Sequence, residues 1–114
     1  MSKLVKRPWG TYTVLAKSKD FLLKKITVLP EGVLSYQSHS YRSEHWIVAQ
    51  GQAEVTIDAK VFTLNENENI FIPKGSVHRI TNNTNNDLVI IEMWYGQKLD
   101  ENDIKRYEDI YKRI

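Results

Sequence analysis

Short runs of β-branched and aromatic residues recur at near-regular intervals along this 114-residue sequence, and turn residues separate them. Proline followed two residues later by glycine marks turns at 8–10, 30–32 and 73–75, and glycines at 51 and 96 mark two more. Nine segments have the composition of strands: residues 11–15, 21–29, 33–37, 44–49, 53–57, 61–64, 70–72, 78–81 and 88–95. Many short strands joined by turns predict an all-β sandwich or barrel, here one domain over residues 1–114 with strands from about 10 to 97.

The spacing of the apolar residues changes near the C-terminus. Asp100 is a candidate helix N-cap, and Lys112 and Arg113 in the last turn suit the negative end of a helix dipole. The sequence therefore predicts one short helix over 100–113, after the strands. The apolar residues on its face are Ile104, Tyr107, Ile110, Tyr111 and Ile114.

Charge and composition exclude several classes of protein. Sixteen Lys and Arg against fourteen Asp and Glu give a net charge of +2, too small and too mixed to indicate nucleic acid or an anionic membrane surface as a partner. No run approaches the roughly 18 apolar residues of a membrane span, and the start of the chain lacks the apolar core of a signal peptide. The chain has no cysteine, which excludes disulfides, zinc–thiolate sites and cysteine nucleophiles. We expect a cytoplasmic protein.

Two of the three histidines lie where they can meet other polar side chains. Gln37 and His39 are two residues apart, so on a strand both side chains leave the same face, and Glu44 begins the next strand and can return to meet them. The turn at 73–75 delivers His78 to the start of another strand. We expect these four side chains to form a cluster that faces a pocket.

The segments around this cluster resemble the paired motifs of the cupin superfamily. Residues 73–82 match the motif P-x-G-x-x-H-x-x-x-N, and residues 32–51 resemble its partner motif, with Gln37 and His39 in place of H-x-H. Gln37 and Asn67 depart from the usual histidine and glycine. The resemblance implies a cupin-type double-stranded β-helix, or jelly-roll barrel, that holds one divalent metal ion. The ligands that it implies are Gln37, His39, Glu44 and His78.

A narrower resemblance, to the type II mannose-6-phosphate isomerases, covers nearly the whole chain. It runs from Arg7-Pro8-Trp9-Gly10 through the segment 37–48 to Ile91-Glu92 and the segment 101–111. In that family this domain is commonly the C-terminal half of an enzyme whose N-terminal half is a mannose-1-phosphate guanylyltransferase. These 114 residues contain no glycine-rich nucleotide-binding segment, so guanylyl transfer is not carried over.

The resemblance implies an isomerase that interconverts mannose 6-phosphate and fructose 6-phosphate in GDP-mannose and polysaccharide biosynthesis. The implied ligand set consists of two imidazoles, an amide oxygen and a carboxylate. This set suits zinc, manganese, iron, cobalt or nickel, and of these we expect zinc. With one carboxylate ligand such an ion keeps a net charge of about +1, so it can draw electrons from the substrate oxygens at C1 and C2 and acidify the C2 proton.

The reaction also needs a base and cations for the phosphate. A base must move the proton between C2 and C1, and the sequence leaves Glu92, Tyr41, Lys74 and His45 as candidates, although His45 alternates with Glu44 and should point away. Arg42, Lys74 and Arg79 are the candidate phosphate-binding residues.

Two other functions remain open from the sequence. The domain can bind a sugar phosphate without catalysis, as an accessory subunit to a separate sugar nucleotidyltransferase, or it can be another cupin enzyme such as an epimerase or a dioxygenase. Residues 44–49 and 88–95 are apolar on both faces, whereas a small barrel has one interior, so we expect a homodimer.

Overall fold

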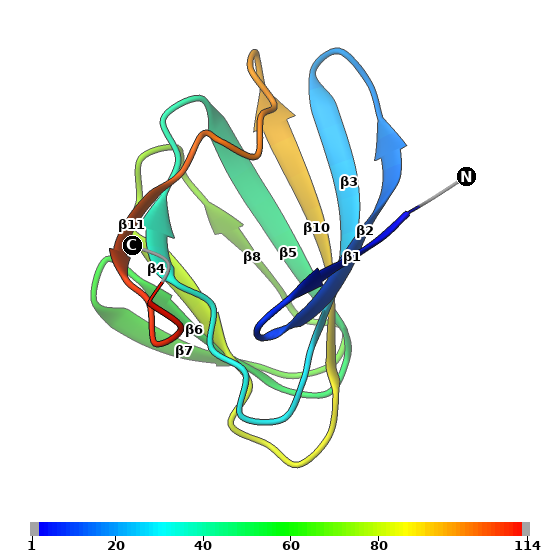
Figure 1. The fold of residues 1–114 in the computed structure, drawn as a ribbon, viewed down its shortest axis with the longest axis vertical. Coiled ribbons are helices and arrows are strands. Elements are labelled where there is room, and N and C mark those ends of the chain that lie inside the picture. The colour runs from blue at the N-terminus through cyan, green and yellow to red at the C-terminus, as the bar shows by residue number, and fades with distance from the viewer. Residues whose placement is uncertain (1–2, 113–114) are drawn as a thin grey trace.

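The computed structural model describes residues 3–112, which form two antiparallel β-sheets that face each other (Figure 1). The six-stranded sheet contains, in spatial order, β1 (Leu4–Arg7), β2 (Gly10–Lys17), β3 (Phe21–Val28), β10 (Leu88–Gly96), β5 (Arg42–Gln50) and β8 (Asn69–Ile72). The five-stranded sheet contains β11 (Lys105–Glu108), β4 (Tyr36–Ser38), β9 (His78–Thr81), β6 (Ala53–Ile57) and β7 (Lys60–Leu64). Over residues 3–112 there is no helix long and apolar enough to cross a membrane. The all-β prediction is confirmed.

Each of the nine predicted strand segments has a counterpart in the structure, with small differences at the ends. The segment predicted at 33–37 is shorter as a strand, because only Tyr36–Ser38 pairs with neighbours and Val33 makes an isolated bridge to Thr81. Strand β1 was not predicted. It pairs with β2 through the tight turn at Pro8-Trp9, where Arg7 lies opposite Gly10.

The predicted helix at 100–113 is wrong over the part that the structure describes, 100–112. The Asp100 carboxylate accepts a hydrogen bond from the Asn102 amide, but the chain then turns and continues as β11, which pairs with β4. Without β11, one edge of β4 would carry unpaired backbone donors and acceptors. A strand can form hydrogen bonds with these groups, whereas a helix cannot. The ring of Tyr107 also packs edge-on against Tyr36, with 6.4 Å between centroids. Arg113 and Ile114 lie outside the described residues.

The interior of the barrel is apolar at one end and polar at the other. Alternation along β3, β5 and β10 turns every second residue inward, and toward one end these residues are aliphatic: Ile26, Val28, Val48, Leu88 and Ile90. Toward the other end the same strands bury Lys24, Arg42, Glu44 and Glu92. Burying charged groups is costly unless they are paired, so the polar end is where a functional site is expected.

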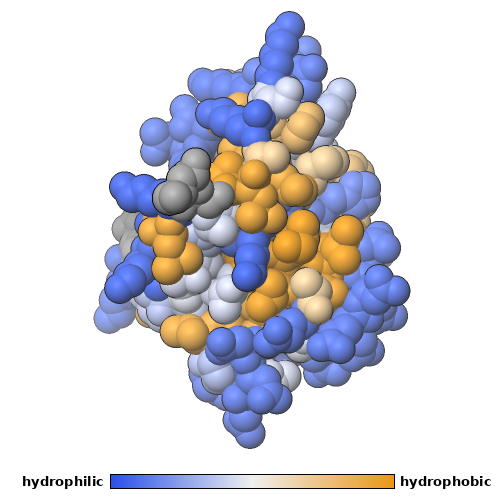
Figure 2. Space-filling view, turned by 90° about the vertical axis from the view of Figure 1, so that its right-hand side faces the viewer, coloured by the Kyte–Doolittle hydropathy of each residue, from blue (hydrophilic) through white to orange (hydrophobic). Residues whose placement is uncertain are grey.

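The outer face of the six-stranded sheet is also apolar. Ile47 and Phe71 are exposed there, and Leu23, Ile91 and Met93 line a shallow groove beside them. Figure 2 shows hydrophobic side chains gathered on this side of the molecule. The strands that were predicted to be apolar on both faces therefore leave one such face uncovered by residues 3–112.

Candidate metal centre

Three of the four predicted metal ligands meet at the polar end of the barrel. His39 follows β4, Glu44 lies on β5, and His78 is the first residue of β9. All three side chains are buried, and one potential ligand atom from each lies within 4.8 Å of the others. Gly75, whose φ of +88° favours glycine, donates its amide to the His39 carbonyl at 3.0 Å and thereby holds the 73–75 turn beside the cluster.

The hydrogen bonds of the two histidines fix which ring nitrogen faces the cluster. Nδ1 of His39 lies 2.6 Å from the backbone oxygen of Asp103, and Nδ1 of His78 lies 2.9 Å from that of Ser76. A carbonyl oxygen can only accept, so each Nδ1 carries the hydrogen and each Nε2 presents a lone pair. Metal-binding histidines are commonly oriented in this way.

The spacing around Glu44 suits an ion. His39 Nε2 lies 3.1 Å from Glu44 Oε2, and His78 Nε2 lies 3.9 Å from Glu44 Oε1. Two ligands bound tetrahedrally at about 2.0–2.2 Å would be about 3.3–3.6 Å apart, which lies between these two distances. Two imidazoles and a carboxylate also form a donor set that zinc and similar ions prefer. The residues present therefore fit a divalent metal ion.

Gln37 lies next to this group. It is the β4 residue opposite His78 of β9 on one side and Arg106 of β11 on the other, and its side chain lines the same cavity. Gln37 thus lies among the residues that line the cavity at the cluster, and its role as a fourth ligand stays a prediction.

Arg42 is buried against the cluster rather than at its rim. Its Nε donates to Glu44 Oε2 at 2.8 Å, its Nη2 lies 3.2 Å from His39 Nε2, and its guanidinium carbon is 3.4 Å from the centroid of the Trp94 ring. The guanidinium thus contacts two of the three ligand atoms. An ion that takes both lone pairs has to displace these contacts.

The electrostatics keep Glu44 ionised and His78 neutral. Burial favours a raised pKa for Glu44, but the adjacent side chains of His39, His78 and Arg42 hold that pKa well below its usual value. Burial also lowers the pKa of His78, and the nearby Glu44 carboxylate offsets only part of that effect. A carboxylate beside a neutral imidazole is the protonation state that metal binding requires.

Glu92 is the candidate base that the structure brings to this end of the barrel. It is buried, it accepts a hydrogen bond from Trp94 Nε1, and it lies opposite Lys24 of β3 and Trp46 of β5. Burial, and then the charge of Glu44, raise the pKa of Glu92 to about 7, although the charge of Lys24 opposes this. A carboxyl group with that pKa can both take and release a proton near neutral pH.

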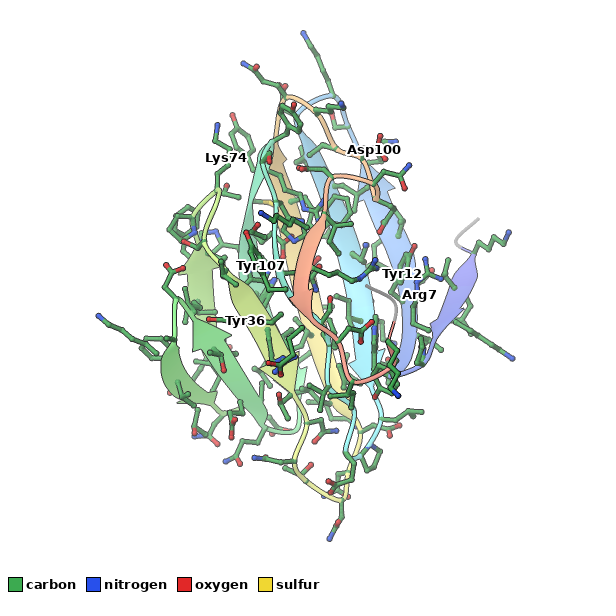
Figure 3. All side chains as sticks on the ribbon, turned by 60° about the vertical axis from the view of Figure 1, so that its left-hand side comes forward. Arg7, Tyr12, Tyr36, Lys74, Asp100 and Tyr107 are labelled. Atoms are coloured by element: carbon green, nitrogen blue, oxygen red, sulfur yellow. The ribbon has the colours of Figure 1, made fainter. Side chains whose placement is uncertain are left out.

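The other predicted catalytic and phosphate-binding residues lie elsewhere. Tyr41 is 51% exposed, and Lys74 is exposed on the turn between β8 and β9 (Figure 3). Arg79 faces away from the interior and binds the Leu34 carbonyl and Glu108. None of Tyr41, Lys74 and Arg79 lines the cavity at the cluster. His45 points outward, as its alternation with Glu44 predicted, with its ring 5.0 Å from that of Phe71.

The cavity at the cluster, of about 220 Å³, contains charged residues that the sequence reasoning did not assign to it. Lys24 was missed because residues 24 and 25 are both lysine and alternation alone does not say which faces inward. The segment expected to be helical supplies two more, which could not be placed without β11. The unassigned charged residues in the lining are Arg7, Lys24, Glu101 and Arg106.

A jelly-roll barrel with a buried His–Glu–His cluster in its polar end defines a cupin, and known structures agree with this class. A cupin domain of Cnp3 from Schizosaccharomyces pombe superposes with a TM-score of 0.74 at 16% identity, covering 82% of this chain and 68% of that one. A single-substitution variant of oxalate decarboxylase from Bacillus subtilis gives a TM-score of 0.82 at 14% identity, covering 93% and 30%. These likenesses show the fold alone.

The chain belongs to the mannose-6-phosphate isomerase C-terminal family, whose sequence pattern matches residues 1–109. The alginate biosynthesis protein AlgA of Pseudomonas putida is 50% identical over 109 residues, which are 96% of this chain and 22% of AlgA. The mannose-1-phosphate guanylyltransferase ManC of Salmonella typhimurium is 43% identical over 114 residues, 100% of this chain and 24% of ManC. The chain thus spans about a quarter of the length of these relatives.

Proposed function

We propose that this domain is a metal-dependent aldose–ketose isomerase that interconverts mannose 6-phosphate and fructose 6-phosphate in the cytoplasm. The observation that supports it most is the buried His39–Glu44–His78 cluster, with both Nε2 lone pairs turned toward one carboxylate. Membership in the mannose-6-phosphate isomerase C-terminal family supports a sugar phosphate as the substrate of this metal site.

In this proposal His39, Glu44 and His78 hold the ion, and the Gln37 amide oxygen completes the set. We propose zinc, because two neutral imidazoles with oxygen ligands suit it. A bound ion would polarise the C1 and C2 oxygens of the substrate and make the C2 proton more acidic.

Glu92 is the proposed base. Its carboxylate takes the proton from C2 and returns it to C1, while the proton of the C2 hydroxyl moves to the C1 oxygen. The indole N–H of Trp94 holds the Glu92 carboxylate in place. Burial raises the pKa of Glu92 to about 7, so near neutral pH this carboxyl group can both accept the proton and release it. Of the predicted substrate-binding residues, Arg42 lies in the same cavity beside the metal ligands, so it is retained as a substrate contact.

A second candidate function is supported by the length of the relatives. ManC is a guanylyltransferase about four times as long as the segment matched here. The same cavity can therefore serve a sugar-phosphate-binding domain that works beside a nucleotidyltransferase without catalysing isomerisation itself.

We also propose that the protein forms a homodimer through the outer face of the six-stranded sheet. Exposed Ile47 and Phe71, with the groove at Leu23, Ile91 and Met93, supply an apolar face on strands β3, β5, β8 and β10. Such a face is stabilised when a second copy covers it.

The test of the proposed function is a coupled assay for fructose 6-phosphate, with zinc-supplemented wild type, Glu92→Gln and His45→Gln. Wild type and His45→Gln should turn over mannose 6-phosphate, because His45 lies on the outer face, whereas Glu92→Gln should lose turnover and keep its metal. Zinc-loaded wild type that binds mannose 6-phosphate and forms no fructose 6-phosphate would instead support the accessory function.

A further inference from the structure

The cavity contains more cations than the metal chemistry uses. Arg7 of β1, Lys24 of β3 and Arg106 of β11 all line it, in addition to Arg42, which is engaged with Glu44. Arg7 and Arg106 belong to the segments shared with the isomerase family, yet neither contributes to the proposed metal site or base. These three cations come from three different strands and converge on one cavity.

Lys24 is the deepest of the three. It is 4% exposed, its Nζ lies 4.0 Å from the ring centroids of both Tyr12 and Trp94, and Glu92 lies opposite it on β10. Its Nζ also forms an ion pair of 2.8 Å with Glu101. A buried ammonium group needs such an anionic partner.

Glu101 is an unusual partner for a buried lysine. Its side chain is 48% exposed, and it belongs to the segment between β10 and β11 rather than to the barrel. Burial raises the pKa of the Tyr12 hydroxyl, and the nearby Glu101 carboxylate raises it further. The barrel therefore has an anion-binding position already, and an exposed carboxylate from a connecting segment fills it.

Arg7 lies beside this position, and Arg106 lines the same cavity. Arg7 Nη2 is 3.4 Å from the Tyr12 hydroxyl, so Arg7 and Lys24 lie against the same ring, and Figure 3 shows Arg7 beside Tyr12. Nε of Arg106 is buried and has no hydrogen-bond partner in the structure. A buried donor without an acceptor is costly, and a bound oxyanion would relieve that cost.

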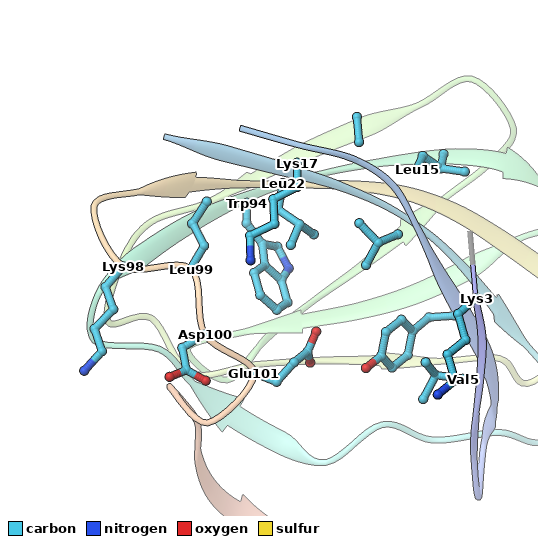
Figure 4. A pocket seen from close by; sticks show the side chains of 13 residues that line it. Lys3, Val5, Leu15, Lys17, Leu22, Trp94, Lys98, Leu99, Asp100 and Glu101 are labelled. Carbon is cyan, nitrogen blue, oxygen red and sulfur yellow. The ribbon is translucent and has the colours of Figure 1, made fainter. Parts of the chain in front are cut away.

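A larger hollow of about 970 Å³ lies outside this position, between the β1–β2 hairpin and residues 98–101 (Figure 4). Tyr12, Trp94 and Glu101 line both this hollow and the cavity at the cluster, so they form the wall between the two. Movement of Glu101 away from Lys24 would join them. The hollow is thus a route by which an anion can reach Lys24.

The strand register sets the distance from Lys24 to the metal cluster. Lys24 and Trp46 flank Glu92 on neighbouring strands, and Glu44 is two residues from Trp46 along β5. With strands about 4.8 Å apart and a rise of about 3.4 Å per residue, the backbones of Lys24 and Glu44 are roughly 12 Å apart. An elongated ligand can therefore reach from one to the other.

We propose that Lys24, Arg7 and Arg106 bind the phosphate of an open-chain sugar phosphate whose C1–C2 end reaches the His39–Glu44–His78 cluster. Glu101 occupies the phosphate position until the ligand displaces it. The identity of the sugar rests on the proposed function, but the anion-binding position does not, because it follows from the contacts of Lys24 and Tyr12 and from the buried, unpartnered Nε of Arg106.

Calorimetric titration of the folded protein with inorganic phosphate, mannose 6-phosphate and mannose tests this proposal. Lys24→Met keeps most of the length of the side chain and removes its charge. Lys25→Met removes the neighbouring outward-facing lysine as a matched control. Lys24→Met should weaken binding of both phosphates by about ten- to a hundredfold, the effect of losing a charge-assisted hydrogen bond. Lys25→Met should bind them as wild type does.

Glu101→Gln gives a result that a merely structural role of Lys24 would not produce. Removal of the competing carboxylate should strengthen binding of inorganic phosphate several-fold, and Lys24→Arg should recover part of the affinity lost in Lys24→Met. Zinc affinity should be the same in all these variants. Phosphate affinity that is unchanged in Lys24→Met, or weakened in Glu101→Gln, would overturn the proposal, as would wild-type protein that binds neither phosphate.

Two outcomes separate this proposal from the proposed function. Lys24-dependent binding of mannose 6-phosphate without formation of fructose 6-phosphate would support the proposed anion site and contradict the proposed isomerase activity. Isomerase activity with the same KM in Lys24→Met and wild type would keep the isomerase and reject the anion site.

Discussion

Replacement of Arg42 by methionine should make the protein bind zinc more tightly. Arg42 donates hydrogen bonds to Glu44 Oε2 at 2.8 Å and to His39 Nε2 at 3.2 Å, and an ion needs both of these atoms. A hydrogen bond to a charged group contributes about 1.5–3 kcal/mol, so removal of the competing cation should lower the zinc Kd by about ten- to a hundredfold. Methionine fills similar space beside Trp94 without a charge.

The same substitution should destabilise the metal-free protein. It leaves Glu44 buried without its guanidinium partner, and loss of one member of a buried ion pair costs about 3–5 kcal/mol. For a domain of this size that corresponds to a Tm lower by roughly 10–20 °C. Zinc should restore most of the difference, because the ion then neutralises Glu44.

Zinc affinity by competition with a chelating dye, and calorimetric Tm with and without zinc, measure both effects. Arg79→Met is the matched control, since Arg79 is one residue from His78 but faces outward and binds Glu108. Folded Arg42→Met with unchanged or weaker zinc affinity, and no larger Tm gain on zinc addition than Arg79→Met, would refute the view that Arg42 and the ion compete.

Other predictions concern pH, substrate affinity and assembly. Burial raises the pKa of Glu92 from 4.5 to about 7, so the folded state holds a proton that the unfolded state has lost at intermediate pH. Relative to Glu92→Gln, the free energy of unfolding of metal-free wild type should therefore fall by about 3 kcal/mol as pH rises from about 5 to about 8, measured by urea unfolding. A difference in unfolding free energy between the two proteins that does not change with pH would contradict the raised pKa. At saturating zinc, Arg42→Ala should raise the KM for mannose 6-phosphate more than it lowers kcat; an equal loss in both would argue against substrate binding by Arg42. Light scattering at tens of micromolar should give a dimer for wild type and a monomer for Phe71→Glu, and a wild-type monomer would count against the dimer.

The parts of the site that could be predicted are those fixed by local spacing. His39 and Glu44 are separated by one turn between two strands, and His78 follows a proline–glycine turn, so local spacing brings them together and the cupin motif indicates that they face inward. The strand segments were predictable for the same reason, because turn residues and β-branched runs are local signals.

The parts that could not be predicted depend on partners distant in sequence. The apolar residues in 104–111 have helical spacing, but part of this segment pairs with the edge of β4 as β11. That pairing brings Arg106 to the cavity. Arg42 belonged to the expected site, yet its position on the ligand atoms follows from stacking on Trp94, more than fifty residues away in the sequence.

Elemental analysis of protein purified without chelators and supplemented with zinc shows whether His39, Glu44 and His78 hold a metal ion. We expect close to one divalent ion per wild-type chain, loss of that ion in His78→Ala, and retention in His45→Ala. Correctly folded wild-type protein that stays metal-free after supplementation would contradict the assignment of His39, Glu44 and His78 as a metal centre.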